Sequence, residues 1–112
     1  MVRNAYTETL ANHGVTKPKE FAICTNATYE GLFGKTAKQL KAQKQIVGSL
    51  RDQMDIRELA YVMASEALSS ERIEDGNSNG LQACRHATAR SAHFIKTAID
   101  ADRRDRREPG LI

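Results

Sequence analysis

A helix-start signal followed directly by a helix-period apolar pattern occupies the middle of the chain. Asp55 and Glu58 in "DIRE" have the spacing of a capping box, in which each side chain accepts a hydrogen bond from the other residue's backbone N–H. Apolar residues then recur at the spacing of one helix face: Ile56, Leu59, Ala60, Met63 and Ala67. The pattern predicts a helix from Asp55 to about Arg72 that buries this face.

A second long helix is predicted after the helix-breaking segment "EDGNSNG". It starts near Gly80, and its apolar and small residues follow a near-heptad order: Leu81, Cys84, Thr88, Ser91 or Ala92, Ile95 and Ile99. This face fits the core of a bundle and fits a partner helix equally well, so it leaves a homodimer open. The helix exits into "DADRRDRREPGLI", a charged segment expected to form a fraying C-terminal tail.

The N-terminal half predicts shorter elements. A helix is expected from about Arg3 to Asn12, with Gly14 as its stop. "EFAICT" fits either a brief extended run or the entry to a helix, and the pattern does not separate the two. Asn26 is expected to cap a short helix through "ATYEGLF" that ends at Gly34. A further helix is expected from Thr36 through Gln45.

These elements predict an all-α fold, a small bundle of about four to five helices. At 112 residues, with 40% hydrophobic and 28% charged residues, the chain fits one globular domain, expected over residues 1–101, with a charged tail at 102–112. Neither an apolar signal sequence nor a run of ~18 apolar residues is present. We therefore expect a cytoplasmic protein with no membrane partner.

The most basic segment of the chain lies between Glu30 and Asp52, where no acidic residue occurs. We call its cations the basic stripe: Lys35, Lys38, Lys41, Lys44 and Arg51. On a helix, a three-residue spacing drifts ~60° per step, which makes a broad positive surface. Such a surface attracts nucleic acid or an acidic protein, and it is equally consistent with a plain solvated face. A weaker second set has nearby acids: Arg103, Arg104, Arg106 and Arg107.

No catalytic or metal-binding set can be assembled from the sequence. His86 and His93 lie ~10 Å apart along one helix, too far for a single metal ion. Cys24 and Cys84 have no local base, and their spacing matches no zinc pattern. "GLFGKT" has two residues between its glycines, whereas a phosphate loop needs four. We expect no enzymatic activity, no cofactor and no metal.

An aromatic pair precedes the basic stripe, and it has two interpretations. Tyr29 and Phe33 could stack on nucleic-acid bases beside the lysines, as in single-strand binders. Aromatic residues make up only 5% of the chain, which favours a place in the core. We expect the pair to hold the corner that orients the lysine-bearing helix.

Several short motifs follow one another in an order that resembles the C-terminal region of the DNA damage-inducible protein D family. They are "RNAY", "GVTKPKEFA", "TNATYEGLFG", "AKQLK", "LRDQM", "ELA" and "GLQACRH", spread over roughly residues 4 to 99. No one of them is highly specific, so the resemblance rests on their colinear succession. Arg90 departs from the pattern, because similar proteins tend to have a glycine there.

The resemblance implies a helical, non-enzymatic module of the DNA-damage (SOS) response or of phage and prophage regulation. Longer members of the family carry a Bro-type N-terminal domain, which we do not expect in this chain. In the family the associated activity is interference with recombinase filaments on single-stranded DNA, and related phage modules act as antirepressors. The expected partner is therefore a protein: a recombinase filament, a repressor or a host defence complex. The alternative is a module that binds DNA or RNA directly through the basic stripe.

Overall fold

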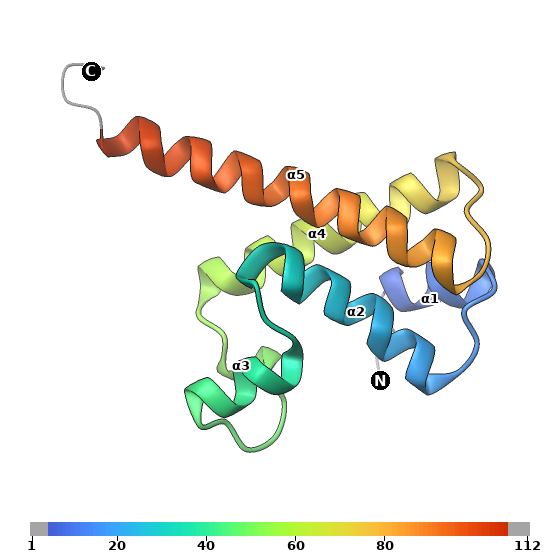
Figure 1. Cartoon of the computed structure of the whole chain (residues 1–112), viewed down its shortest axis with the longest axis horizontal. Helices are drawn as coiled ribbons and strands as arrows, with labels where there is room; N and C mark the ends of the chain where they lie inside the picture. The colour runs from blue at the N-terminus through green and yellow to red at the C-terminus, as the bar shows by residue number, and fades with distance from the viewer. Residues whose placement is uncertain (1–4, 108–112) are drawn as a thin grey trace.

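The computed structural model describes residues 5–107 and shows a helical bundle (Figure 1). Its helices are α1 (Ala5–Asn12), α2 (Pro18–Phe33), α3 (Ala37–Lys44), α4 (Ile56–Asp75) and α5 (Leu81–Arg107), with a short 3-10 helix η1 (Arg51–Gln53). No strand occurs among the described residues. Helix α5 packs along α2 and α4, α1 packs on α4, and α3 lies at one end of the molecule. The predicted all-α bundle is confirmed.

The predicted capping box at the start of α4 is present. The Asp55 side chain accepts a hydrogen bond from the Glu58 N–H at 2.8 Å, and the Glu58 side chain accepts one from the Asp55 N–H at 3.2 Å. Helix α4 then extends three residues beyond the predicted Arg72, to Asp75. Thr36 and Gln39 form the same reciprocal arrangement at the start of α3. Local hydrogen bonds therefore fix both starts, as capping principles predict.

The segment from Pro18 to Phe33 is one continuous helix, which decides between the two alternatives for "EFAICT". The predicted cap at Asn26 is wrong, because Asn26 lies inside α2. Its side-chain oxygen instead accepts the backbone N–H of Ala37 at 2.9 Å, so it satisfies a free donor at the start of α3. Gly34 ends α2 with φ of 73°, the left-handed conformation that glycine adopts without strain.

Four of the five residues predicted to form the buried face of α4 are exposed, and only Leu59 is partly buried. Ile56 is 83% exposed and Met63 58% exposed, while Ala60 and Ala67 are also exposed. The face that packs inward is polar in part: Val62, Ser65, Glu66, Ser69 and Ile73. Small serine side chains let neighbouring helices approach closely, and Glu66 is neutralised by an arginine from outside the helix. A hydrophobicity pattern alone does not register either effect.

The near-heptad face of α5 belongs to the core. Cys84, Thr88, Ser91 and Ala92 are buried, and Ile95 and Ile99 pack against the same core from its edge. The helix continues to Arg107, past residue 101, where the tail was expected to begin. The last part of that expected tail, residues 108–112, lies outside the described residues, as do the first two residues of the predicted N-terminal helix.

The core has two parts, one at each end of the α2–α5 contact. The first contains Tyr6, Leu10, Val15, Cys24, Ile73, Cys84 and Ala87, and the second contains Tyr29, Leu32, Leu40, Leu50, Val62 and Ala92. The Tyr6 hydroxyl shares a hydrogen bond with Thr88 at 2.6 Å inside the first part. Between the helices, Gly31 faces Ala92 so closely that a Cβ at residue 31 would lie 2.5 Å from the Ala92 Cβ. Glycine thus sets the spacing of α2 and α5.

Both cysteines are fully buried free thiols, and this gives the fold a pH dependence. Burial raises the pKa of Cys24 to about 11, against an ordinary value of 9.0, and it raises the pKa of Cys84 as well. The folded protein therefore holds the Cys24 proton more tightly than the unfolded chain does. The contribution to stability is complete below pH 9 and is lost as the pH rises to 11, about 3 kcal/mol in all.

We expect urea titrations to show this loss in the wild-type chain and a flatter curve over the same pH window in Cys24→Ala. The difference between the two chains isolates the thiol from other groups that titrate at high pH. Alkylation of native wild-type protein near neutral pH should proceed only as fast as unfolding exposes the thiols. Equal pH curves for the two chains, or rapid alkylation without unfolding, would contradict the assignment of Cys24 to the sealed core.

Candidate interaction surface

Helix α3 presents the lysines of the basic stripe at one end of the bundle (Figure 1). Lys38 is exposed and Lys41 is partly exposed. Lys35 lies just before α3, and its ammonium group donates a hydrogen bond to Gln43 of that helix. Helix α3 has no acid of its own to offset these three cations.

Lys44, the next member of the basic stripe, is held by an ion pair. Its ammonium group lies 2.7 Å from the Glu58 carboxylate at the start of α4. Both side chains are partly exposed, so the pair contributes little stability, of order 0–1 kcal/mol. It does cancel much of the charge at Lys44 and ties the end of α3 to α4.

Arg51 is also tied to an acid. It stands in η1, outside α3, and its guanidinium contacts both oxygens of Glu66, with Nη1 at 3.0 Å from Oε1. Glu66 is buried, with 5% of its area exposed. The hydrogen bonds to Glu66 raise the pKa of Arg51 further, so the group stays charged. Its charge balances a buried carboxylate, and we therefore leave Arg51 out of the interaction surface.

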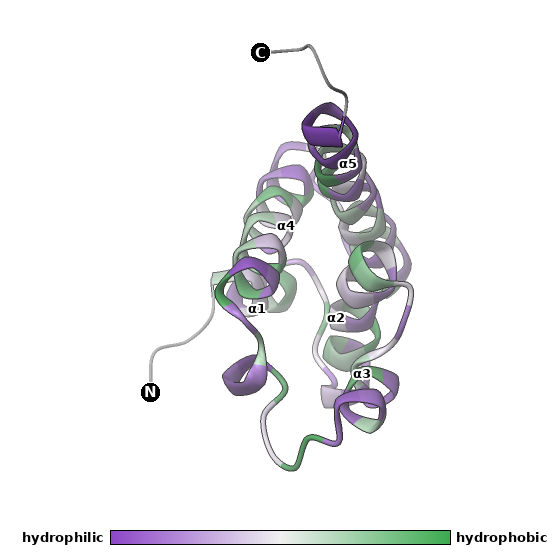
Figure 2. Cartoon of the chain, turned by 90° about the vertical axis from the view of Figure 1, so that its left-hand side faces the viewer, coloured by the Kyte–Doolittle hydropathy of each residue, from purple (hydrophilic) through white to green (hydrophobic). Residues whose placement is uncertain are grey.

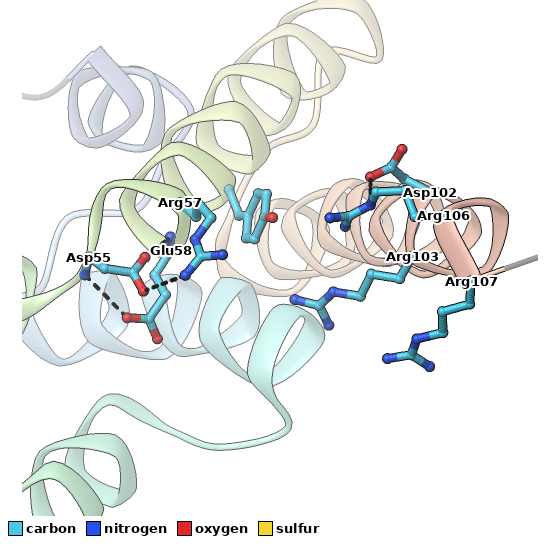
Figure 3. Close-up of a pocket in the computed structure, with 8 residues that line it drawn as sticks. Asp55, Arg57, Glu58, Asp102, Arg103, Arg106 and Arg107 are labelled. Atoms are coloured by element: carbon cyan, nitrogen blue, oxygen red, sulfur yellow. Dashed lines mark hydrogen bonds and ion pairs between the residues drawn. The ribbon is translucent and has the colours of Figure 1, made fainter. Parts of the chain in front are cut away.

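The arginines at the end of α5 border an open cleft of about 680 Å³ (Figure 3). Its walls come from the start of α4 and the end of α5: Asp55, Arg57, Glu58, Tyr61, Asp102, Arg103, Arg106 and Arg107. Arg106 pairs with Asp102 at 3.0 Å, and Arg57 approaches Asp55 at 3.8 Å. Figure 3 shows Arg103 and Arg107 extending to the same side of α5. Arg104 lies outside this cleft and borders a smaller one with Asp100, Arg103 and Arg107.

The start of α4 is bordered by the end of α3, through Lys44, and by the end of α5. Glu58 pairs with Lys44 of α3, and it also lines the cleft that holds Arg103 and Arg107. We define the basic surface as two groups of cations, Lys35, Lys38 and Lys41 at α3 and Arg103 and Arg107 at the end of α5. The sequence did not indicate that Glu58 contacts Lys44 and also lines the cleft with Arg103 and Arg107. The only local signal was the capping box, which placed this helix start without revealing its neighbours.

The aromatic pair before α3 belongs to the core, as the composition favoured. Tyr29 is 3% exposed, and its ring stacks on Phe33 with centroids 6.5 Å apart. Because the face of a stacking platform must be open to a base, Tyr29 does not provide one. The pair supports the end of α2 from which the chain turns into α3.

The histidines stand in separate surroundings. His13 shares a hydrogen bond with the Ser78 carbonyl oxygen at 2.9 Å through Nδ1, and the His93 ring meets the edge of Phe94. Over residues 5–107 no three His, Cys, Asp or Glu side chains gather as a metal site would require. Nor is any helix in that range long and apolar enough to cross a bilayer. The notable chemistry of the described surface is positive charge, which suits acidic surfaces and phosphates.

Comparison with protein families identifies this chain. The family model described as the DinD C-terminal domain matches residues 2–107, nearly the whole chain. Searches of curated proteins and of solved structures return no match. The chain therefore belongs to the DinD C-terminal domain family.

Proposed function

We propose that this chain is a non-enzymatic regulator that binds a protein acting on DNA and modulates it through the basic surface. The observation that carries the proposal is the set of lysines on α3, which face solvent on a helix without acids. The family resemblance supplies the class of partner: a recombinase filament, a repressor or a host defence complex. The proposal places this activity in the cytoplasm, where such partners work.

Electrostatics explains why such a surface suits the partner. Single-stranded DNA is a polyanion, and the long-range field of an anionic target attracts a cationic patch before contact. Charge pairs at an interface mainly raise the association rate and select the partner, and they weaken as salt rises. The basic surface is therefore suited to recognising a partner protein.

A second candidate function is direct binding of DNA or RNA. It is favoured by the extension of Arg103 and Arg107 to the same side of α5, since phosphates bind guanidinium groups well (Figure 3). A direct binder loses affinity steeply and linearly in log units as salt increases, whatever the protein context. A regulator requires the partner protein for tight binding. Comparing binding to bare DNA with binding to protein-coated DNA therefore distinguishes the two functions.

We expect Lys38→Glu combined with Lys41→Glu to weaken binding to a recombinase filament by about 100-fold at low salt. Two cations become two anions on the surface that meets the partner, so attraction becomes repulsion. The measurement is biolayer interferometry on single-stranded DNA, bare or coated with a bacterial recombinase. Circular dichroism should show an unchanged helix content, because Lys38 is exposed and Lys41 partly so.

Lys17→Glu combined with Lys19→Glu is the matched control. It changes the net charge equally, on exposed residues at the opposite end of α2, roughly 24 Å along its axis. The control should bind the coated DNA as wild type does. If both double variants lose affinity equally, the effect comes from net charge and not from the basic surface. If the wild-type chain binds bare and coated DNA equally well, direct nucleic-acid binding is favoured.

A further inference from the structure

Helix α4 carries an apolar stripe that no described part of the chain covers. The stripe consists of Ile56, Ala60, Met63, Ala64 and Ala67, all exposed. These residues recur at intervals of three and four, so they follow one face of the helix for about 17 Å. In Figure 2, α4 is an outer helix with hydrophobic residues along its length. The inward face of the same helix is the partly polar one described above.

Charges of opposite sign stand at the two ends of the stripe. Arg57, with 79% of its side chain exposed, lies at the start of the helix, and exposed Glu71 lies near its end. Ala64 is midway between them in the sequence. A second, antiparallel α4 related by a two-fold axis near Ala64 would therefore place each Arg57 beside the Glu71 of the other copy. Parallel helices would place like charges together.

We propose that two copies of this chain associate through the apolar stripe, with their α4 helices antiparallel. A two-fold interface must be complementary to itself, and the pairing of Arg57 with Glu71 across the axis meets this requirement in charge. The three alanines permit a close approach of the helix axes, while Ile56 and Met63 supply apolar area at the flank. The two pairings of Arg57 with Glu71 fix the direction and the register of the helices.

The stripe contains none of the residues of the basic surface, although Arg57, which sets the register, lines the cleft beside Arg103 and Arg107. It replaces the near-heptad face of α5 as the place for a dimer, since that face is occupied by the core. A dimer would present two copies of the basic surface to one partner. Repetition of a weak site on one particle raises its avidity toward a repeating target such as a filament.

Sedimentation equilibrium of the full chain tests the proposal. We expect the wild-type chain to reach the mass of two chains as its concentration rises to millimolar, and Ala64→Glu to stay at the mass of one chain. Val47→Glu is the control, because Val47 is 96% exposed and lies in the loop outside α4, and this variant should behave as wild type. A wild-type chain that stays single at every concentration, or an Ala64→Glu chain that still pairs, would overturn the proposal.

A charge exchange tests the antiparallel direction. Arg57→Glu and Glu71→Arg should each weaken the dimer roughly ten-fold, because each change acts at both ends of the two-fold interface. The two changes together restore opposite charges and should return the dissociation constant to near its wild-type value. A combined variant no tighter than the single ones would rule out the pairing of Arg57 with Glu71.

Discussion

Gly31→Val should lower the free energy of unfolding by about 3 kcal/mol, the upper end of the cost of overpacking a core. A Cβ at residue 31 would lie 2.5 Å from the Ala92 Cβ, far inside van der Waals contact. Helix α2 would have to move away from α5 along its length, and the buried Tyr29 and Leu32 would lose part of their packing. Urea unfolding followed by circular dichroism measures the change.

Substitutions at Gly31 and at Ala92 together separate the effect of helix spacing from the effect of helix propensity. Gly31→Ala gains about 1 kcal/mol of helix propensity, so any loss of stability in this variant comes from the contact with Ala92. Adding Ala92→Gly removes the opposing methyl group and should recover much of that loss. If the double variant is only as stable as independent effects predict, the two residues do not set the spacing of the helices.

Arg51→Ala should destabilise the fold by about 3 kcal/mol, because it leaves a buried carboxylate without its guanidinium partner. Both oxygens of Glu66 accept hydrogen bonds from Arg51. The pair also connects η1 to the middle of α4, so its loss frees the connection that follows α3. The measurement is the midpoint of urea unfolding at neutral pH.

Two variants serve as controls for the Arg51 prediction. Lys44→Ala breaks the exposed pair with Glu58 and should change stability by no more than about 0.5 kcal/mol. Replacing Arg51 and Glu66 together by Met removes the buried charge and should recover most of the stability. An Arg51→Ala chain as stable as Lys44→Ala would contradict the structural role of Arg51 and return this residue to the surface available for binding.

The elements that the sequence predicted well are those fixed by local hydrogen bonds. Asp55 and Glu58 cap α4, and Gly34 stops α2 in the left-handed conformation, because these effects act within a few residues. Asn26 shows the limit of such reasoning. It is a good capping residue, yet its oxygen caps a helix that begins eleven residues later, and only the tertiary fold brings the two together.

Tertiary contacts also explain the reversed faces of α4. The sequence offered two stripes at helical spacing, one apolar and one containing Ser65, Glu66 and Ser69. The second is buried because small side chains admit close packing and because Arg51 neutralises Glu66 from outside the helix. Hydrophobic periodicity ranks the two stripes by their hydrophobicity. It therefore selects the apolar stripe, which the fold leaves exposed.

The candidate surface was predictable only in part for the same reason. The absence of acids between residues 30 and 52 identified the lysines of α3 directly. Charge counting gave the same weight to Arg51 and Lys44, although Glu66 and Glu58 pair with them from α4. It also placed the α5 arginines in a tail, whereas the helix continues and holds Arg103 and Arg107 beside the start of α4.

The central claim is that the basic surface binds a protein partner. Its most direct test is affinity capture of the tagged chain from a lysate of DNA-damaged bacteria, with and without nuclease, using wild type and both double-lysine variants. We predict one stoichiometric protein that survives nuclease, is retained by Lys17→Glu with Lys19→Glu, and is lost by Lys38→Glu with Lys41→Glu. Capture that disappears with nuclease, or that the Lys38 and Lys41 changes leave intact, would contradict the claim.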